Sequence, residues 1–98
     1  MLYYCAYTWH HGTTPEQVSR QILASHEAGL IDPLSIRGYY SLVGGGAGVL
    51  VLEVEDPAAL NRALAPSMHL MSWDVRALIE RDYQQDLAEI RREVGQGS

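Results

Sequence analysis

The sequence contains no lysine, no phenylalanine and only one cysteine, Cys5. A lone cysteine excludes a disulfide within the chain, which is typical of a reducing compartment, so we expect a cytoplasmic protein. Seven arginines, spread along the chain, supply the formal positive charge, and the net charge is −5. Because a phosphate backbone is bound by a basic face, these charges argue against nucleic acid as a partner.

Long hydrophobic runs are absent as well. No apolar stretch approaches the ~20 residues of a membrane-spanning helix, so we expect no membrane association. The first residues have no basic segment before their apolar run, and a secretory signal is therefore not expected. With 47% hydrophobic and 19% charged residues, the composition is typical of a globular protein with one core. We therefore expect residues 1–98 to form a single domain.

The chain does contain two helix starts that are marked by proline. Thr14-Pro15-Glu16-Gln17 has the residues of a capping box, and Asp56-Pro57 places proline behind an acidic N-cap. Gly29 is suited to close the first helix, and Asp82 is suited to cap a last one at about 83–94. Strand-like apolar runs surround these helices, at residues 2–9, 35–43, 49–55 and 73–80.

The order of these elements is strand, helix, strand, strand, helix, strand and an extra C-terminal helix. It predicts an α+β fold of the ferredoxin-like βαββαβ type, with a four-stranded antiparallel sheet and two helices on one face. The glycine-rich segment 44–48 joins the two middle strands and predicts a loose hairpin. The first strand is apolar on both faces, so we expect both faces to be covered.

Two helices on one side leave the opposite face of the sheet uncovered. Its expected footprint of roughly 400 Å² matches the largest apolar patches that soluble monomers tolerate. Either a second copy of the chain or the last helix, folded back, would cover it. We favour a symmetric homodimer, because tyrosine and arginine, which this face contains, are enriched in protein interfaces.

Two segments carry a resemblance to a known fold family. Arg37-Gly38-Tyr39-Tyr40 precedes the glycine-rich hairpin, and the run from Glu53 to Leu60 leads into the second helix. Together with the short aromatic first strand, they resemble the dimeric α+β barrel superfamily. Within it, the chain is most similar to an uncharacterised bacterial family of proteins of roughly a hundred residues with no assigned activity.

The resemblance implies a two-fold dimer with a small-molecule pocket between helices and sheet in each subunit. The wider superfamily includes cofactor-free monooxygenases, haem-degrading enzymes, muconolactone isomerases and stress-induced barrels, so no single reaction is implied. In the bacterial family an aromatic–histidine pair is frequent at the position of Tyr40-Ser41. Any role of that histidine is therefore missing or displaced in this chain.

His26 is the first candidate for chemistry, since it lies on the apolar side of the first helix with Val18 and Ile22. Because imidazole titrates near neutrality, His26 is the candidate catalytic residue, transferring a proton in the pocket. The alternative is a core histidine bonded to a carbonyl and a tyrosine. His10, in the loop after the first strand, would either reach the pocket or remain solvated.

The segment Met68-His69-Leu70-Met71 offers ligands that would suit copper(I), or an axial haem ligand at His69. Nothing in the sequence supplies the further ligands, and the two methionines are more simply core residues. We therefore expect no metal and no cofactor, with haem and copper as alternatives. Cys5 is expected to be an inert buried thiol.

Because phenylalanine is absent, most of the large rings carry a polar group, and together they are sufficient to line a pocket for a planar or apolar ligand. The alternative for each ring is ordinary packing in the core or in an interface. The residues predicted to bind the ligand are Trp9, His10, Tyr40, His69 and Trp73.

The leading hypothesis is a small dimeric α+β barrel that binds a partly apolar molecule in a pocket of each subunit. An enzymatic version would be a cofactor-free monooxygenase or an isomerase-like enzyme, with His26 moving a proton. The alternative is a non-catalytic module that senses a ligand or binds a protein through its surface or its C-terminal helix. The sequence leaves both open.

Overall fold

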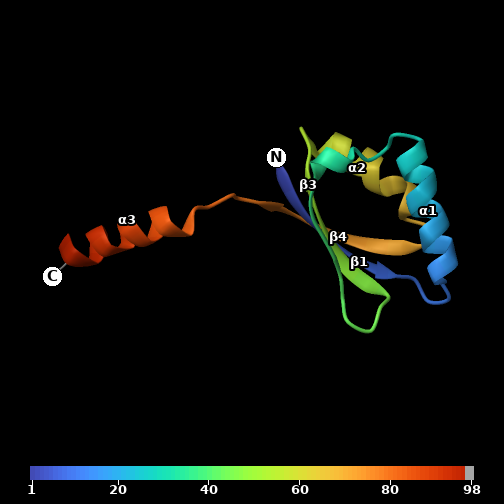
Figure 1. The fold of residues 1–98 in the computed structure, drawn as a ribbon, viewed down its shortest axis with the longest axis horizontal. Helices are drawn as coiled ribbons and strands as arrows, with labels where there is room; N and C mark the ends of the chain where they lie inside the picture. Colours follow the sequence, from blue (N-terminus) through green and yellow to red (C-terminus); the bar gives the residue numbers. More distant parts are fainter. Residues whose placement is uncertain (97–98) are drawn as a thin grey trace.

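Four strands form one antiparallel sheet in the order β2-β3-β1-β4 (Figure 1). This computed structural model describes residues 1–96 of the chain. The element order β1-α1-β2-β3-α2-β4-α3 confirms the predicted α+β fold class and is consistent with a ferredoxin-like fold. The strands are β1 (Leu2–Trp9), β2 (Ile36–Ser41), β3 (Ala47–Glu53) and β4 (Met71–Leu78). The helices are α1 (Pro15–Glu27), α2 (Pro57–Leu64) and α3 (Tyr83–Gln96).

The helices begin where the local sequence signals predict. Thr14 caps α1 through a complete capping box: the Gln17 backbone nitrogen donates to Thr14 Oγ1, and the Gln17 side chain accepts from the Thr14 backbone nitrogen. Asp56 caps α2 and Asp82 caps α3, since each carboxylate accepts from the backbone N–H three residues later. Gly29, with a φ of 71°, follows the end of α1 in a conformation that favours glycine.

The main core lies between α2 and the face of the sheet that also carries α1 (Figure 1). Leu60 and Leu64 of α2 pack there, as the sequence predicts. Alternate residues of β1 and β3 supply the facing side chains, because successive side chains of a strand point to opposite faces. The buried members of this cluster are Tyr3, Cys5, Leu50, Leu52, Leu60 and Leu64.

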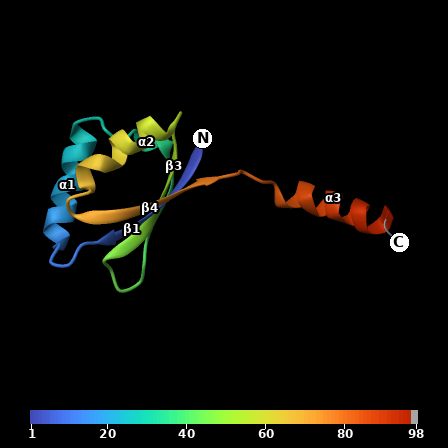
Figure 2. The same ribbon diagram turned by 180° about the vertical axis from the view of Figure 1, so that it is seen from behind.

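The opposite face of the sheet, called the open face below, is covered by no element of residues 1–96 (Figures 1 and 2). Leu2, Tyr4 and Ala6 of β1 lie on it and remain partly exposed. Within a single copy, therefore, only one of the two faces of β1 is covered, and coverage of the open face by a second copy stays a prediction. The reason is that the residues covering the other face, from α1 and α2, all lie on one side of the sheet.

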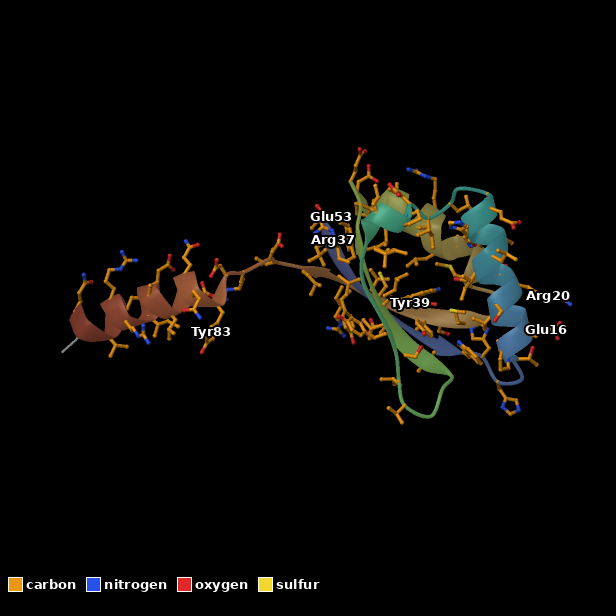
Figure 3. The ribbon with its side chains drawn as sticks, viewed as in Figure 1. Glu16, Arg20, Arg37, Tyr39, Glu53 and Tyr83 are labelled. Carbon is orange, nitrogen blue, oxygen red and sulfur yellow. The ribbon has the colours of Figure 1, made fainter. Side chains whose placement is uncertain are left out.

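A β-bulge near Arg37 changes which face each tyrosine of β2 occupies. Ile36 pairs with Leu52, but Gly38 pairs with Val51, so the register shifts by one residue at Arg37. Because side chains alternate along a strand, this shift places Tyr39 on the helix-covered face and Tyr40 on the open face. Figure 3 shows Tyr39 on the α1 side of the sheet.

α3 does not fold back over the open face. In both views it lies apart from the sheet, beyond the end of β4 (Figures 1 and 2). The molecule is accordingly elongated, with extents of 59, 30 and 18 Å. No helix within residues 1–96 is both long enough and apolar enough to cross a membrane. The sequence predicts a frayed tail at residues 96–98, but Gln96 is the last residue of α3, and residues 97–98 lie outside the described residues.

Candidate functional site

A cavity of about 510 Å³ lies between α1 and the helix-covered face of the sheet. Its volume is within the usual range of small-molecule sites, roughly 300–1,000 Å³. All four strands contribute to it, and none of the lining residues is Asp, Glu, Lys or Arg. The lining residues are Tyr7, Val18, Gln21, Ile22, Ser25, His26, Ile31, Pro33, Ile36, Tyr39, Leu50, Ala63, Leu64, Ser67, Met71 and Trp73.

α1 forms one wall of the cavity because its inward residues recur at the helical period. Val18, Ile22 and Ser25 are spaced by four and three residues, so they share one side of the helix. Val18 is buried against Leu70 and Met71, but Ile22 is 51% exposed. α1 therefore packs closely near its start and less closely further along, which leaves the cavity open to solvent on one side.

Two polar side chains of α1 form a pair in this wall. The Gln21 side-chain amide donates to Ser25 Oγ across 3.1 Å. Ser25 is only 6% exposed, although its hydroxyl proton has no acceptor among the described residues. This arrangement leaves the Ser25 hydroxyl able to donate and the Gln21 carbonyl oxygen able to accept. The pair can therefore recognise one neutral polar group on a ligand that is otherwise apolar.

Trp73 forms the opposite wall and is held in place by hydrogen bonds. Its indole nitrogen donates to Ser67 Oγ across 2.8 Å, and the Ser67 hydroxyl donates to the Leu64 carbonyl across 2.8 Å. The ring of Tyr7 packs against it at a centroid distance of 5.4 Å with the planes tilted by 59°. An oriented aromatic wall of this kind suits a planar ligand. Trp73, predicted to bind the ligand, thus lines the cavity.

His26, the predicted catalytic residue, also lines the cavity, at its solvent-exposed side. The structure gives its ring no hydrogen-bond partner among residues 1–96, so it is not a buried core histidine bonded to a carbonyl and a tyrosine. A catalytic base is usually oriented by a second group. His26 is therefore positioned to reach a bound molecule but lacks such an orienting partner.

Trp9, His10 and His69 are predicted ligand residues that do not line the cavity. They lie at the end of the sheet where β1 leaves and β4 begins. His10 Nδ1 donates to the His69 carbonyl across 3.3 Å, and His10 Nε2 lies 3.1 Å from Ser72 Oγ. Since a carbonyl only accepts, the proton is assigned to Nδ1 and the Ser72 hydroxyl donates to Nε2. His10 therefore connects the loop after β1 to the start of β4 by side-chain hydrogen bonds.

Tyr40 lies on the open face, and its neighbour Tyr39 lines the cavity instead. Sequence alternation alone could not find this, because the bulge near Arg37 reverses the two positions. Gln21 and Ser25 also line the cavity, although the sequence pattern did not select them as candidates. Ser25 carried a signal, since it lies on the same side of α1 as Val18 and Ile22.

The segment around His69 does not resemble a metal site. Met71 is buried in a cluster with Val18 and Leu70, whereas Met68 and His69 are exposed. Among residues 1–96, no group of three or more His, Cys, Asp or Glu side chains is arranged to hold a metal ion. The methionines therefore have different surroundings, and Met71 is a core residue.

Cys5 lies in the core, outside the cavity, and burial raises the pKa of its thiol from 9.0 to about 11. Since the thiolate is the reactive form, we expect an aromatic disulfide reagent to modify Cys5 no faster than the protein unfolds. Rapid modification of the folded protein would contradict this expectation.

The raised pKa of Cys5 also predicts a contribution to the free energy of unfolding that is fully present below pH 9.0 and is lost as the pH rises towards about 11. Urea titrations of wild type and Cys5→Ala across this pH range measure that contribution.

The comparisons with known proteins give one family. The model of a family described as a domain of unknown function (DUF3303) matches residues 1–91. No curated protein matches the chain. The matched range contains the whole sheet, α1, α2 and most of α3, and therefore every residue that lines the cavity.

Proposed function

Because the chain belongs to this family of domains of unknown function, we propose its function from its own cavity: it binds one small, uncharged and mostly apolar molecule between α1 and the sheet. The observation that carries the proposal is the apolar lining of a cavity of about 510 Å³. Transferring an apolar molecule from water into such a lining is favourable. A charged molecule would lose its hydration without meeting a charged Asp, Glu, Lys or Arg side chain, which is costly.

The bound molecule carries one neutral polar group that faces α1. Ser25 and Gln21 offer a donor and an acceptor side by side, a pattern that matches a hydroxyl or an enol better than a carboxylate. The opposite wall is aromatic, with Trp73 held by Ser67. A planar ring against Trp73 with its hydroxyl directed to Ser25 is therefore the pose that we propose.

A catalytic function is the second candidate, and the position of His26 favours it. His26 is the one histidine of the described residues that lines the cavity. In this version it transfers a proton to or from the bound molecule in a cofactor-free isomerisation or oxygenation. The missing orienting partner makes binding the primary proposal and catalysis the secondary one.

The functional unit in this proposal is a homodimer of the α+β barrel type, in a cytoplasmic protein. The open face supports it: Tyr4, Val49 and Val51 form an apolar centre, flanked by the ion pairs Arg37–Glu53 and Arg76–Asp74. Packing the open faces of two copies together would remove this centre from water. In a two-fold interface the same patch of both subunits is buried in this way.

The ligand class is tested with three probes that share one ring system: naphthalene, naphthol and naphthoate. Isothermal titration calorimetry of the purified protein is expected to give the tightest binding for naphthol. Naphthalene should bind about two- to tenfold more weakly, because one neutral hydrogen bond contributes about 0.5–1.5 kcal/mol. Naphthoate should bind most weakly of the three, because its charge remains unpaired.

Ser25→Ala is the matching variant, and it should remove the advantage of naphthol over naphthalene while naphthalene binding stays unchanged. Ser19→Ala on the exposed side of α1 is the control and should keep the wild-type order. Preference for naphthoate, or an advantage of naphthol that survives in Ser25→Ala, overturns the proposed ligand class. Absence of binding by all three probes overturns the proposed function.

A further inference from the structure

We infer that α3 is an exchanged arm, whose apolar stripe binds a second copy of this chain. The stripe consists of Tyr83, Leu87, Ile90 and Val94, which recur at intervals of four, three and four residues. The inference rests on the homodimer of the proposed function but not on its ligand. It assigns to α3 a partner that the ligand site does not require.

Three of the four stripe residues are exposed in the single chain, and Leu87 is half-buried. Tyr83 is 74% exposed, Ile90 is 52% exposed and Val94 is 68% exposed. The apolar surface continues into the preceding segment, where Ile79 is 87% exposed. Figure 3 shows Tyr83 on α3, well away from the sheet. An apolar surface of this kind is typical of a docking site rather than of a solvated helix.

The length of α3 gives a second reason to expect a partner. It has 14 residues, and isolated helices shorter than about 12–15 residues are only marginally stable in water. The cap at Asp82 and the ion pair between Arg81 and Asp86 support its first turn. The remaining stability of a short helix comes from packing of its apolar side against another element. No element of residues 1–96 lies beside the α3 stripe (Figures 1 and 2).

The area that a dimer needs identifies the partner as a second copy. A stable interface buries about 800 Å² on each partner, whereas the open face offers roughly 400 Å². α3 is about 21 Å long and about 10 Å wide, so its stripe covers about 200 Å². Since each copy would give one α3 and receive another, exchange adds about 400 Å² per copy, which brings the interface to about the required size.

The charges of α3 do not favour a lipid surface instead. Asp86, Glu89 and Glu93 are balanced only in part by Arg91 and Arg92. Helices that lie on membranes carry basic residues on their polar side, because the cytoplasmic surface is anionic. The polar side of α3 thus suits water at the edge of a protein interface.

The variant Leu87→Asp/Ile90→Asp in the full chain places two charges in the stripe. Sedimentation velocity should then show a dimer that dissociates about tenfold or more easily than wild type. The control Gln85→Asp/Ala88→Asp adds the same charges on the opposite side of α3 and should leave the dimer unchanged. An unchanged dimer in the stripe variant overturns the inference, and so does weakening by the control to the same degree.

Cross-linking distinguishes exchange between copies from contact within one copy. A benzophenone amino acid replaces Tyr83, and unlabelled protein is mixed with heavy-nitrogen protein before irradiation. Cross-linked peptides that join one light and one heavy segment are expected. Cross-links confined to single chains overturn the inference, as does capture of α3 by phosphatidylserine vesicles with loss of the dimer. A wild-type monomer would overturn both the dimer and the arm, whereas the naphthol titration tests the cavity separately.

Discussion

Gly48→Ala is expected to destabilise the protein by about 3 kcal/mol or more, because an added Cβ would come closer to its neighbours there than at any other glycine of residues 1–96. A Cβ at Gly48 would collide with the backbone carbonyl oxygen of Tyr40 and with the ring and hydroxyl of Tyr7. The Tyr40 carbonyl belongs to the neighbouring strand and cannot turn away as a side chain can. Since natural domains are stable by only about 5–15 kcal/mol, urea unfolding should show a much lower midpoint.

Two further variants separate the steric collision at Gly48 from the cost of backbone conformation alone. Gly45→Ala has open space around its Cβ but a φ of 79°, so it should cost only about 1–2 kcal/mol from backbone conformation. Adding Tyr7→Ala to Gly48→Ala should not restore stability, because the carbonyl of Tyr40 remains in place. If Gly48→Ala unfolds at the wild-type urea midpoint, the close approach of β2 and β3 is wrong.

Ala63→Phe is expected to weaken naphthol binding by about tenfold or more, since a steric block or a lost apolar contact readily costs about 1.4 kcal/mol. Ala63 is a buried residue of α2 that lines the cavity, so a phenyl ring there would occupy space that the ligand needs. The fold should tolerate this change, because the added ring enters empty volume rather than packed core. Calorimetric titration measures the affinity, and urea unfolding measures the stability.

Ala58→Phe is the matched control on α2. Ala58 is exposed and does not line the cavity, so the same ring should leave naphthol affinity unchanged. Equal affinity of Ala63→Phe and wild type would show that the probe binds elsewhere. Loss of affinity in both variants would point to a general effect on α2 rather than to the cavity.

The sequence predicts the elements well because their signals are local. Thr14, Asp56 and Asp82 each form the cap that their side chains favour, and the proline behind Thr14 and Asp56 begins α1 and α2. The alternation of β3, with Leu50 and Leu52 inward, also follows directly from the pattern. Each of these features depends on residues that are close together in the chain.

The residues that line the cavity are predicted less well, because they depend on contacts between distant segments. Tyr39 replaces Tyr40 because of a one-residue bulge in β2, which no short pattern marks. His10 forms hydrogen bonds to His69 and Ser72, which are far from it in the sequence. It therefore connects the end of β1 with the start of β4 and does not line the cavity. The direction of α3 likewise depends on the segment after β4, and the stripe alone does not reveal it.

The most direct test of the account is the location of bound naphthol, measured by nuclear Overhauser effects to assigned protons of the protein. The account predicts contacts with Trp73, Ile22 and Tyr39, which line the cavity from three different elements. Contacts with Tyr40 or Val49 on the open face, and none with Trp73, would contradict it.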